Sequence, residues 1–159
     1  MRPFYVRPIF CLKGKVRLPG DKSIAHRALI LSAISKGKTL IRNYPANKDC
    51  LRTLQAFKKL GVKIISKKDT CLKEALCVAV YGKGLGGLTM PKGPIFAGES
   101  GTTLRLLSGI LAGQHFESRI EAGPSLRLRP MRRITIPLRL MGASIQARIK
   151  KTRGGSLEE

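Results

Sequence analysis

The 159-residue sequence contains no tryptophan, and aromatic residues make up only 5% of it. Acidic residues are also scarce, with 9 Asp and Glu against 31 Lys and Arg. The resulting formal net charge of +22 predicts an anionic partner: a nucleic acid, an anionic lipid, or a small phosphorylated or carboxylated substrate. So few carboxylates leave little material for catalysis by a pair of acidic side chains.

The residues that usually bind metals are few and scattered. The two histidines, His26 and His115, stand far apart in the sequence, and no CxxC pair occurs, which argues against a zinc site. The four cysteines are irregularly spaced and the opening residues lack a signal-peptide pattern, so we expect reduced thiols in a cytoplasmic protein. No apolar run approaches the ~18 residues that a membrane-spanning helix needs.

The apolar pattern predicts a chain of alternating strands and helices. Helices are expected over 23–36, 49–60, 101–112 and 130–141. Strands are expected over 4–18, 39–44, 62–66, 74–82, 116–123 and 143–149, with 62–66 and 74–82 forming a pair. A glycine-rich stretch, 82–98, is expected to lack regular structure, and residues 151–159 to form a loose polar tail.

The two halves of the sequence show a similar order of features. Arg27 recurs as Arg105, and LGVKI at 60–64 recurs as MGASI at 141–145. Each half is predicted to run helix, glycine, strand, helix, glycine, strand. We therefore expect an internal repeat of about 80 residues, present in about two copies.

The segment LPGDKSIAHRA at 18–28 combines a turn with the start of a helix. The turn places Lys22 and Ser23 in the first helical turn, where unpaired backbone N–H groups and the positive end of the helix dipole favour an anion. Arg27 lies four residues after Ser23 and projects from the same face. These residues are either a phosphate and carboxylate site or the solvated side chains of a capped amphipathic helix.

The segment AGESGTTLR at 97–105 repeats this arrangement. It places Gly101, Thr102 and Arg105 at a predicted helix start, where small residues let a ligand approach the backbone closely. The alternative is an ordinary glycine-containing helix start without a ligand.

A third segment, SLRLRPMRR at 125–133, gathers arginines around another helix start, and Arg129 is one of them. Taken alone, these arginines fit the phosphate backbone of a nucleic acid equally well. The scarcity of aromatics disfavours a single-strand binder, because such proteins usually stack bases on aromatic rings. A duplex binder stays open as an alternative, although a nucleic acid is the less favoured partner.

Taken in order, PGDKSIAHRA, ESGTTLRLL and LRPMRR followed by PLRLMGA resemble the N-terminal part of the 5-enolpyruvylshikimate-3-phosphate synthase (3-phosphoshikimate 1-carboxyvinyltransferase) family. The resemblance covers most of residues 13–149. It implies an α/β (α+β) fold, the inside-out barrel of enolpyruvyl transferases, with about two of six βαβαββ units present. Residues 1–20 would be a strand of the first, discontinuous domain, and residues 21–150 an incomplete second domain.

The resemblance also implies a reaction and its site. The enolpyruvyl group would pass from phosphoenolpyruvate to the 5-hydroxyl of shikimate 3-phosphate, releasing phosphate, in the shikimate pathway and with no metal or organic cofactor. Carried over by motif, Lys22 contacts both substrates and is the candidate catalytic residue, while Ser23 and Arg27 hold shikimate 3-phosphate. Gly101 lies against phosphoenolpyruvate, and Arg129 binds its anionic groups. Two further residues are candidates for substrate binding: Thr102 and Arg105.

Two positions depart from the family pattern: Ala25 stands where a second serine is usual, and Glu99 where asparagine is common. The family's enzymes are much longer, and the resemblance places their acidic general base in the second half. We therefore expect a truncated or split enzyme, inactive alone, that exposes apolar surface and needs a complementing C-terminal chain. The alternatives are a relative acting on UDP-N-acetylglucosamine and a basic nucleic-acid-binding module.

Overall fold

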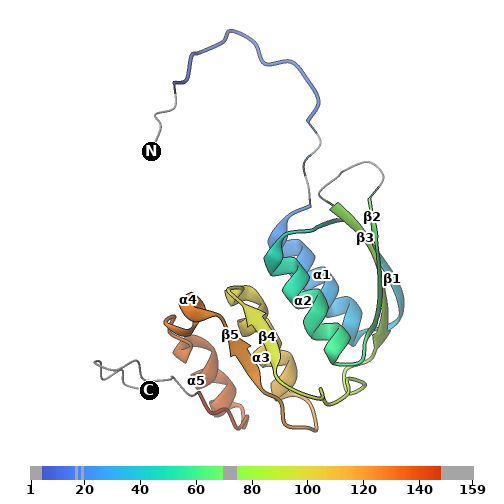
Figure 1. Cartoon of the computed structure of the whole chain (residues 1–159), viewed down its shortest axis with the longest axis vertical. Coiled ribbons are helices and arrows are strands. Elements are labelled where there is room, and N and C mark those ends of the chain that lie inside the picture. Colours follow the sequence, from blue (N-terminus) through green and yellow to red (C-terminus); the bar gives the residue numbers. More distant parts are fainter. Residues whose placement is uncertain (1–4, 17, 19, 70–74, 148–159) are drawn as a thin grey trace.

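The computed structural model describes residues 5–16, 18, 20–69 and 75–147. Figure 1 shows helices α1 and α2 between a three-stranded sheet and a smaller two-stranded one. The elements follow in chain order as α1 (Lys22–Ile34), β1 (Lys36–Pro45), α2 (Lys48–Lys59), β2 (Lys63–Lys68), β3 (Ala75–Lys83), β4 (Ile95–Gly98), α3 (Gly101–Ala112), β5 (Ile120–Ala122), α4 (Pro124–Arg127) and α5 (Arg132–Leu140).

The larger sheet has the strand order β1-β3-β2, and both outer strands are antiparallel to β3. The outer strands are therefore parallel to each other, and α2 makes the crossover that parallel strands require. Alternation along β3 gives the sheet two different faces. Val78 and Val80 are fully buried in the core. Tyr81 lies on the other face, its ring centroid 5.7 Å from Lys38 Nζ and 5.0 Å from Lys63 Nζ.

The smaller sheet pairs β4 with β5 in parallel, and α3 connects the two strands. Leu29 of α1, Phe57 of α2 and Leu107 of α3 join Ile95 of β4 in one buried core. Burying a large apolar side chain contributes roughly 1.5–3 kcal/mol. The core therefore fixes the three helices relative to one another, and with them the positions of their N-termini.

The predicted helices form close to their predicted positions. α3 spans the predicted 101–112, and α1, α2 and α5 begin and end within two residues of their predicted bounds. The predicted strand pair is confirmed as β2 and β3, and β1 extends the strand expected over 39–44. The order α1-β1-α2 recurs as α3-β5-α5, as the repeat predicts, with the short α4 inserted.

The strand expected over 4–18 does not form in residues 5–16 and 18. These residues are exposed, and Figure 1 shows them leading away from the rest of the molecule. A strand needs a neighbour to pair its backbone N–H and C=O groups, so an apolar pattern alone does not produce one. The assignment of residues 1–20 to a separate domain stays a prediction.

The strand expected over 143–149 is also wrong for residues 143–147. The Arg139 side chain donates to the Ile145 carbonyl from Nε at 3.0 Å and from Nη2 at 2.7 Å. An arginine thus occupies an acceptor that a neighbouring strand would use. Residues 148–149 and the predicted tail at 151–159 lie outside the described residues.

Two short elements were not predicted from the sequence. β4 lies within the glycine-rich stretch expected to be irregular, and α4 follows β5, which is itself shorter than the strand expected over 116–123. Both elements span four residues, too few to give a recognisable apolar period. In the described part of the chain, no helix has the length and apolar character to cross a membrane.

Candidate functional site

The turn before α1 is held by a bulge in β1. The pairing of β1 with β3 shifts between Ile41 and Tyr44, and Asn43 adopts the left-handed conformation with a φ of 56°. Its Nδ2 donates to the Leu18 carbonyl at 3.2 Å. A side chain at Gly20 would overlap the Asn43 carbonyl oxygen, so the close approach of this turn requires glycine.

The N-terminus of α1 is capped from within its own motif. Asp21 is the N-cap: its Oδ1 accepts from the Ile24 amide at 2.7 Å, and its carbonyl from the Ala25 amide at 2.9 Å. The amides of Lys22 and Ser23 have no acceptor among the described residues. They are therefore available to a ligand at the positive end of the helix dipole.

The predicted side chains of α1 lie at its surface. Arg27 Nη1 donates to the Ser23 carbonyl at 3.1 Å, which holds the guanidinium near the helix start. Lys22 Nζ lies 3.0 Å from Asp49 Oδ2, in the first turn of α2. The Lys22 side chain is 52% exposed, and ion pairs of exposed groups contribute only about 0–1 kcal/mol. An anionic ligand can therefore compete with Asp49 for Lys22.

The N-terminus of α3 repeats the arrangement of α1. Ser100 is its N-cap, and the Ser100 Oγ accepts from the Thr103 amide at 3.2 Å. The Gly101 and Thr102 amides, like the corresponding pair in α1, have no acceptor within the described part of the chain. A Cβ at Gly101 would lie 2.7 Å from Arg105 Nη1, so glycine lets the guanidinium lie against the helix start.

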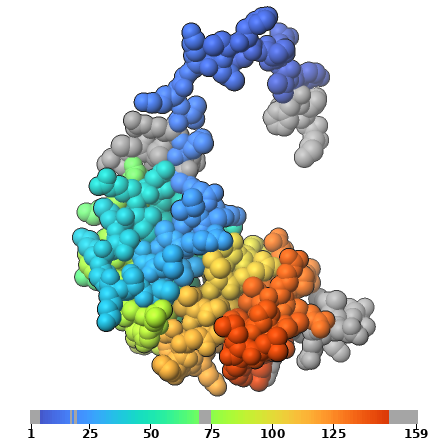
Figure 2. All heavy atoms as spheres, turned by 180° about the vertical axis from the view of Figure 1, so that it is seen from behind, coloured from blue at the N-terminus to red at the C-terminus, as the bar shows by residue number. Residues whose placement is uncertain are grey.

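Arg129 is connected to the same helix end by α4, which packs against it. The buried Leu126 has its Cδ1 3.5 Å from the position that a Cβ would take at Gly101. The Arg129 amide donates to the Leu126 carbonyl at 3.1 Å, and the Arg129 side chain is exposed. Figure 2 shows the surfaces of α1 (blue), α3 (yellow) and α4 (orange) adjoining on one side of the molecule.

The N-termini of α1 and α3 meet through the first turn of α2. Thr103 Oγ1 lies 3.4 Å from the Asp49 carbonyl oxygen, while the Asp49 carboxylate holds Lys22. Cys50 Sγ, in the same turn, lies 3.9 Å from the Lys22 carbonyl. The structure therefore brings the predicted residues of α1 and α3 to the same end of the helix layer, and Arg129 is connected to that end through Leu126, which packs against Gly101.

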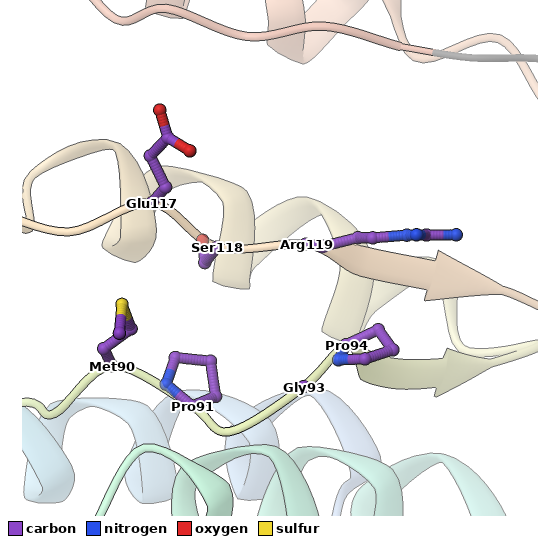
Figure 3. Close-up of a pocket in the computed structure, with 7 residues that line it drawn as sticks. All are labelled: Met90, Pro91, Gly93, Pro94, Glu117, Ser118 and Arg119. Carbon is purple, nitrogen blue, oxygen red and sulfur yellow. The ribbon is translucent and has the colours of Figure 1, made fainter.

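A hollow of about 420 Å³ lies at the other end of β4 and β5 (Figure 3). It is lined by Met90, Pro91, Gly93, Pro94, Glu117, Ser118 and Arg119. These residues directly precede β4 and β5, whereas the start of α3 follows β4 and Arg129 follows β5. The hollow is therefore separate from the helix N-termini.

Comparison with known proteins places this geometry in a family. The family model for EPSP synthase (3-phosphoshikimate 1-carboxyvinyltransferase) matches residues 6–153. The chain belongs to the EPSP synthase family. It is 45% identical over 153 residues to the 3-phosphoshikimate 1-carboxyvinyltransferase of Bacillus thuringiensis (strain Al Hakam), covering 92% of this chain and 34% of the relative. The enzyme of the same name from Alkaliphilus metalliredigens (strain QYMF) is 47% identical over 137 residues, covering 86% of this chain and 31% of the relative.

A solved structure of EPSP synthase from Acinetobacter baumannii superposes with a TM-score of 0.76 at 44% identity. The match covers 84% of this chain and 28% of that one. The predicted α/β fold of this family is thereby confirmed over the matched part. The chain spans about a third of the length of the curated relatives that it matches.

The two departures from the EPSP synthase pattern have structural explanations. Ala25 is 6% exposed, and its methyl group packs in the core, where it leaves no polar group to satisfy. Glu99 Oε2 accepts from the Leu126 amide at 2.8 Å, and Oε1 from the Ser125 amide at 3.4 Å. The negative charge of Glu99 is therefore stabilised by backbone amides at the start of α4.

Two residues that connect the helices of this family member are absent from the sequence-based predictions: Asp49 and Thr53. Asp49 gave a signal, since it is an acidic residue in the first turn of a predicted helix. Thr53 gave none, because a threonine inside an amphipathic helix is unremarkable in sequence. It is 1% exposed, and its Oγ1 lies 2.6 Å from His26 Nδ1.

Proposed function

We propose that this chain forms a substrate-binding face of an enolpyruvyl transferase. The reaction moves the enolpyruvyl group from phosphoenolpyruvate to the 5-hydroxyl of shikimate 3-phosphate and releases phosphate. One observation carries the proposal: two capped helix N-termini adjoin in a member of the EPSP synthase family, each with cationic side chains and two backbone amides that have no acceptor among the described residues. Such helix starts are suited to phosphate and carboxylate groups.

The residues divide between the two substrates. In this proposal the α1 end, with Lys22, Ser23 and Arg27, holds shikimate 3-phosphate, and Lys22 also contacts phosphoenolpyruvate. The α3 end, with Gly101, receives phosphoenolpyruvate, and Arg129 binds its anionic groups. Two flanking residues of α3 add a hydroxyl and a guanidinium to the same region: Thr102 and Arg105.

Charge explains why such a site favours the reaction. Both substrates are polyanions, so cations and helix N-termini offset their mutual repulsion and hold the reacting atoms in line. Lys22 is at the junction of the two ends, because its carbonyl contacts α2 and its ammonium group lies beside Asp49. In this position it stabilises charge, or handles a proton, at the 5-hydroxyl.

The carboxylates nearest to these amides are already engaged. Asp21 caps α1, Asp49 pairs with Lys22, and Glu99 accepts from amides of α4. A general base must lie within hydrogen-bond reach of the proton that it removes. We therefore infer that the acidic general base comes from outside the described residues, and that a complementing polypeptide supplies it.

We also infer a cytoplasmic location. Cys11, Cys50 and Cys77 are unpaired thiols, as is usual in a reducing compartment. Burial raises the pKa of the Cys50 thiol, so this group stays protonated and unreactive at neutral pH.

Calorimetric titration of the folded chain with shikimate 3-phosphate tests the proposal. We expect binding that shikimate without the phosphate group does not show. Arg27→Ala and Lys22→Ala should each weaken it about tenfold or more, since a hydrogen bond to a charged group contributes roughly 1.5–3 kcal/mol. Lys63→Ala, which removes a cation from β2, is the matched control and should bind like the wild type.

Two competitors separate the alternative functions. Displacement of shikimate 3-phosphate by UDP-N-acetylglucosamine would contradict the substrate and point to the related sugar-nucleotide transferase. Tight binding of a labelled DNA duplex at physiological salt, with a steep salt dependence and no binding of shikimate 3-phosphate, would instead favour the nucleic-acid module.

A further inference from the structure

A buried hydrogen-bond network joins the three helices directly beneath the proposed site. His26 Nδ1 of α1 lies 2.6 Å from Thr53 Oγ1 of α2, which lies 2.7 Å from Thr103 Oγ1 of α3. Thr103 Oγ1 in turn lies 2.7 Å from the Oγ of Ser100, the N-cap of α3. All four side chains are at most 1% exposed. This buried network therefore links α1 to the N-cap of α3 through direct hydrogen bonds between buried side chains.

The number of hydrogens fixes the direction of the network. A hydroxyl group has one hydrogen to donate. The one hydrogen of Thr103 Oγ1 goes to Ser100 Oγ or to the Asp49 carbonyl, so Thr103 accepts from Thr53, and Thr53 in turn accepts from His26. His26 must then carry its ring proton on Nδ1, and Nε2 has no partner among the described residues. This order assigns the His26 tautomer.

The charges around His26 agree with a neutral ring. Burial lowers its pKa, the nearby Asp49 opposes this effect, and the cations Lys22 and Arg27 add to it. A second ring proton would leave a buried N–H without an acceptor among the described residues. The ring therefore remains neutral, with Nδ1 as its only donor.

Each member of the network lies next to a candidate residue. His26 is one helical turn after Lys22 and directly precedes Arg27. Thr103 directly follows Thr102, whose amide has no acceptor in the described part of the chain, and the Thr103 hydroxyl also lies within 3.4 Å of the Asp49 carbonyl. A shift of any one helix start would therefore break a buried hydrogen bond and leave a buried polar group unsatisfied, which is costly.

We propose that His26 is a positioning residue that, through Thr53, Thr103 and Ser100, fixes the N-terminus of α1 relative to that of α3. An anion bound at one helix start then favours the geometry that binds an anion at the other. The identity of the anions rests on the function proposed above, whereas the hydrogen-bond order does not. His26 itself is buried and touches neither substrate.

Two variants of His26 separate a positioning role from packing. His26→Asn keeps a neutral N–H donor at about the place of Nδ1, whereas His26→Leu removes it. His115→Leu makes the same change at an exposed histidine outside the network and is the matched control. If only packing mattered, the leucine variant would be equal to the asparagine variant or better, because it leaves fewer polar atoms on α1 to satisfy.

The test uses the isotope-labelled 159-residue chain and NMR. We expect the ring signals of His26 to show the tautomer protonated on Nδ1, with His115 as the internal reference. Phosphoenolpyruvate should bind more tightly when shikimate 3-phosphate is present, by about five- to tenfold, as typical couplings are. His26→Leu should abolish this coupling, His26→Asn should retain most of it, and His115→Leu should leave it unchanged.

Hydrogen exchange at the Gly101 and Thr103 amides gives a readout that needs no substrate. His26→Leu should speed exchange in this first turn of α3 about tenfold, while His26→Asn should not. A His26 ring protonated on Nε2 would overturn the proposal, as would equal exchange in the two His26 variants. If neither substrate binds the wild type, the proposed function fails, and the tautomer and exchange results still decide the positioning role.

Discussion

Gly20 is the residue on which the approach of the first turn to β1 depends. A Cβ there would overlap the backbone carbonyl oxygen of Asn43, which is fixed by the bulge in β1. We expect Gly20→Ala to lower the free energy of unfolding by about 1–3 kcal/mol, the usual cost of overpacking. Urea denaturation measures this, with Gly86→Ala as control, because a Cβ at Gly86 meets nothing within 4 Å. Equal urea midpoints for Gly20→Ala and Gly86→Ala would contradict the close contact between Gly20 and the Asn43 carbonyl.

His26 predicts how stability depends on pH. Burial is the main cause that lowers its pKa in the folded protein below the ordinary 6.5. The unfolded chain therefore takes up a proton more readily, and the free energy of unfolding should fall as the pH drops below about 6.5. Denaturation curves between about pH 8 and about pH 5 should show this loss in the wild type and less of it in His26→Asn. If His26→Asn kept the full loss of unfolding free energy at low pH while His115→Asn showed none, the loss would belong to His115 and not to His26.

At this scale the sequence indicates residues that act within one helix and misses partners that depend on packing. Lys22, Ser23 and Arg27 are recognisable because helical spacing alone puts them on one helix start. Their partners lie far along the chain: Asp49 is 27 residues from Lys22, and Thr53 is 27 residues from His26. Those pairs exist only because α1 packs beside α2, and no local pattern indicates that arrangement.

Among the elements, α4 depends on a carboxylate that directly follows β4. Glu99 accepts from the Leu126 and Ser125 amides and so acts as the missing N-cap, since Gly123 has no side chain. We expect Glu99→Ala to cost about 1 kcal/mol, as other lost caps do, and to speed exchange of the Leu126 amide roughly fivefold. Glu117→Ala, at an exposed carboxylate before β5, is the control. Unchanged exchange in the Glu99 variant would show that α4 does not rely on this contact.

Helices were easier to predict than strands for a physical reason. A helix satisfies its backbone hydrogen bonds within a short segment, so caps such as Ser100 and periodic apolar residues locate α3 from its sequence alone. A strand depends on a neighbour. Residues 5–16 have no neighbouring strand among the described residues. The four residues of β4, in contrast, pair in parallel with β5.

The whole molecule has one end rich in helix N-termini and a surface with exposed apolar side chains. On α1, Ile24 is 69% and Leu31 is 63% exposed, and beyond α5 Met141 is 82% exposed. This agrees with the expectation that about two repeat units expose apolar surface. Because Ile24 neighbours Ser23 and precedes Arg27, part of this apolar surface adjoins the proposed substrate-binding face. A polypeptide that covers this apolar surface would therefore also adjoin the proposed substrate-binding face.

This arrangement predicts that the 159-residue chain does not turn over substrate by itself. The proposed face collects cations and helix amides, to which the proposal assigns the binding of two anions, but the carboxylates beside it are engaged in caps and an ion pair. Removing the proton of the 5-hydroxyl needs a base within reach, and general acid–base groups contribute about 10²–10⁴-fold to rates.

The decisive assay measures phosphate released from phosphoenolpyruvate together with shikimate 3-phosphate, after circular dichroism has shown that the chain is folded. We expect no release above the level seen with either substrate alone, although both substrates bind. Release that requires both substrates and is lost in Lys22→Ala would contradict this expectation, because the proton would then have to be handled by groups within this chain. Lys22, which the proposal assigns to both anions, would in that case act as the base itself rather than as a stabilising charge.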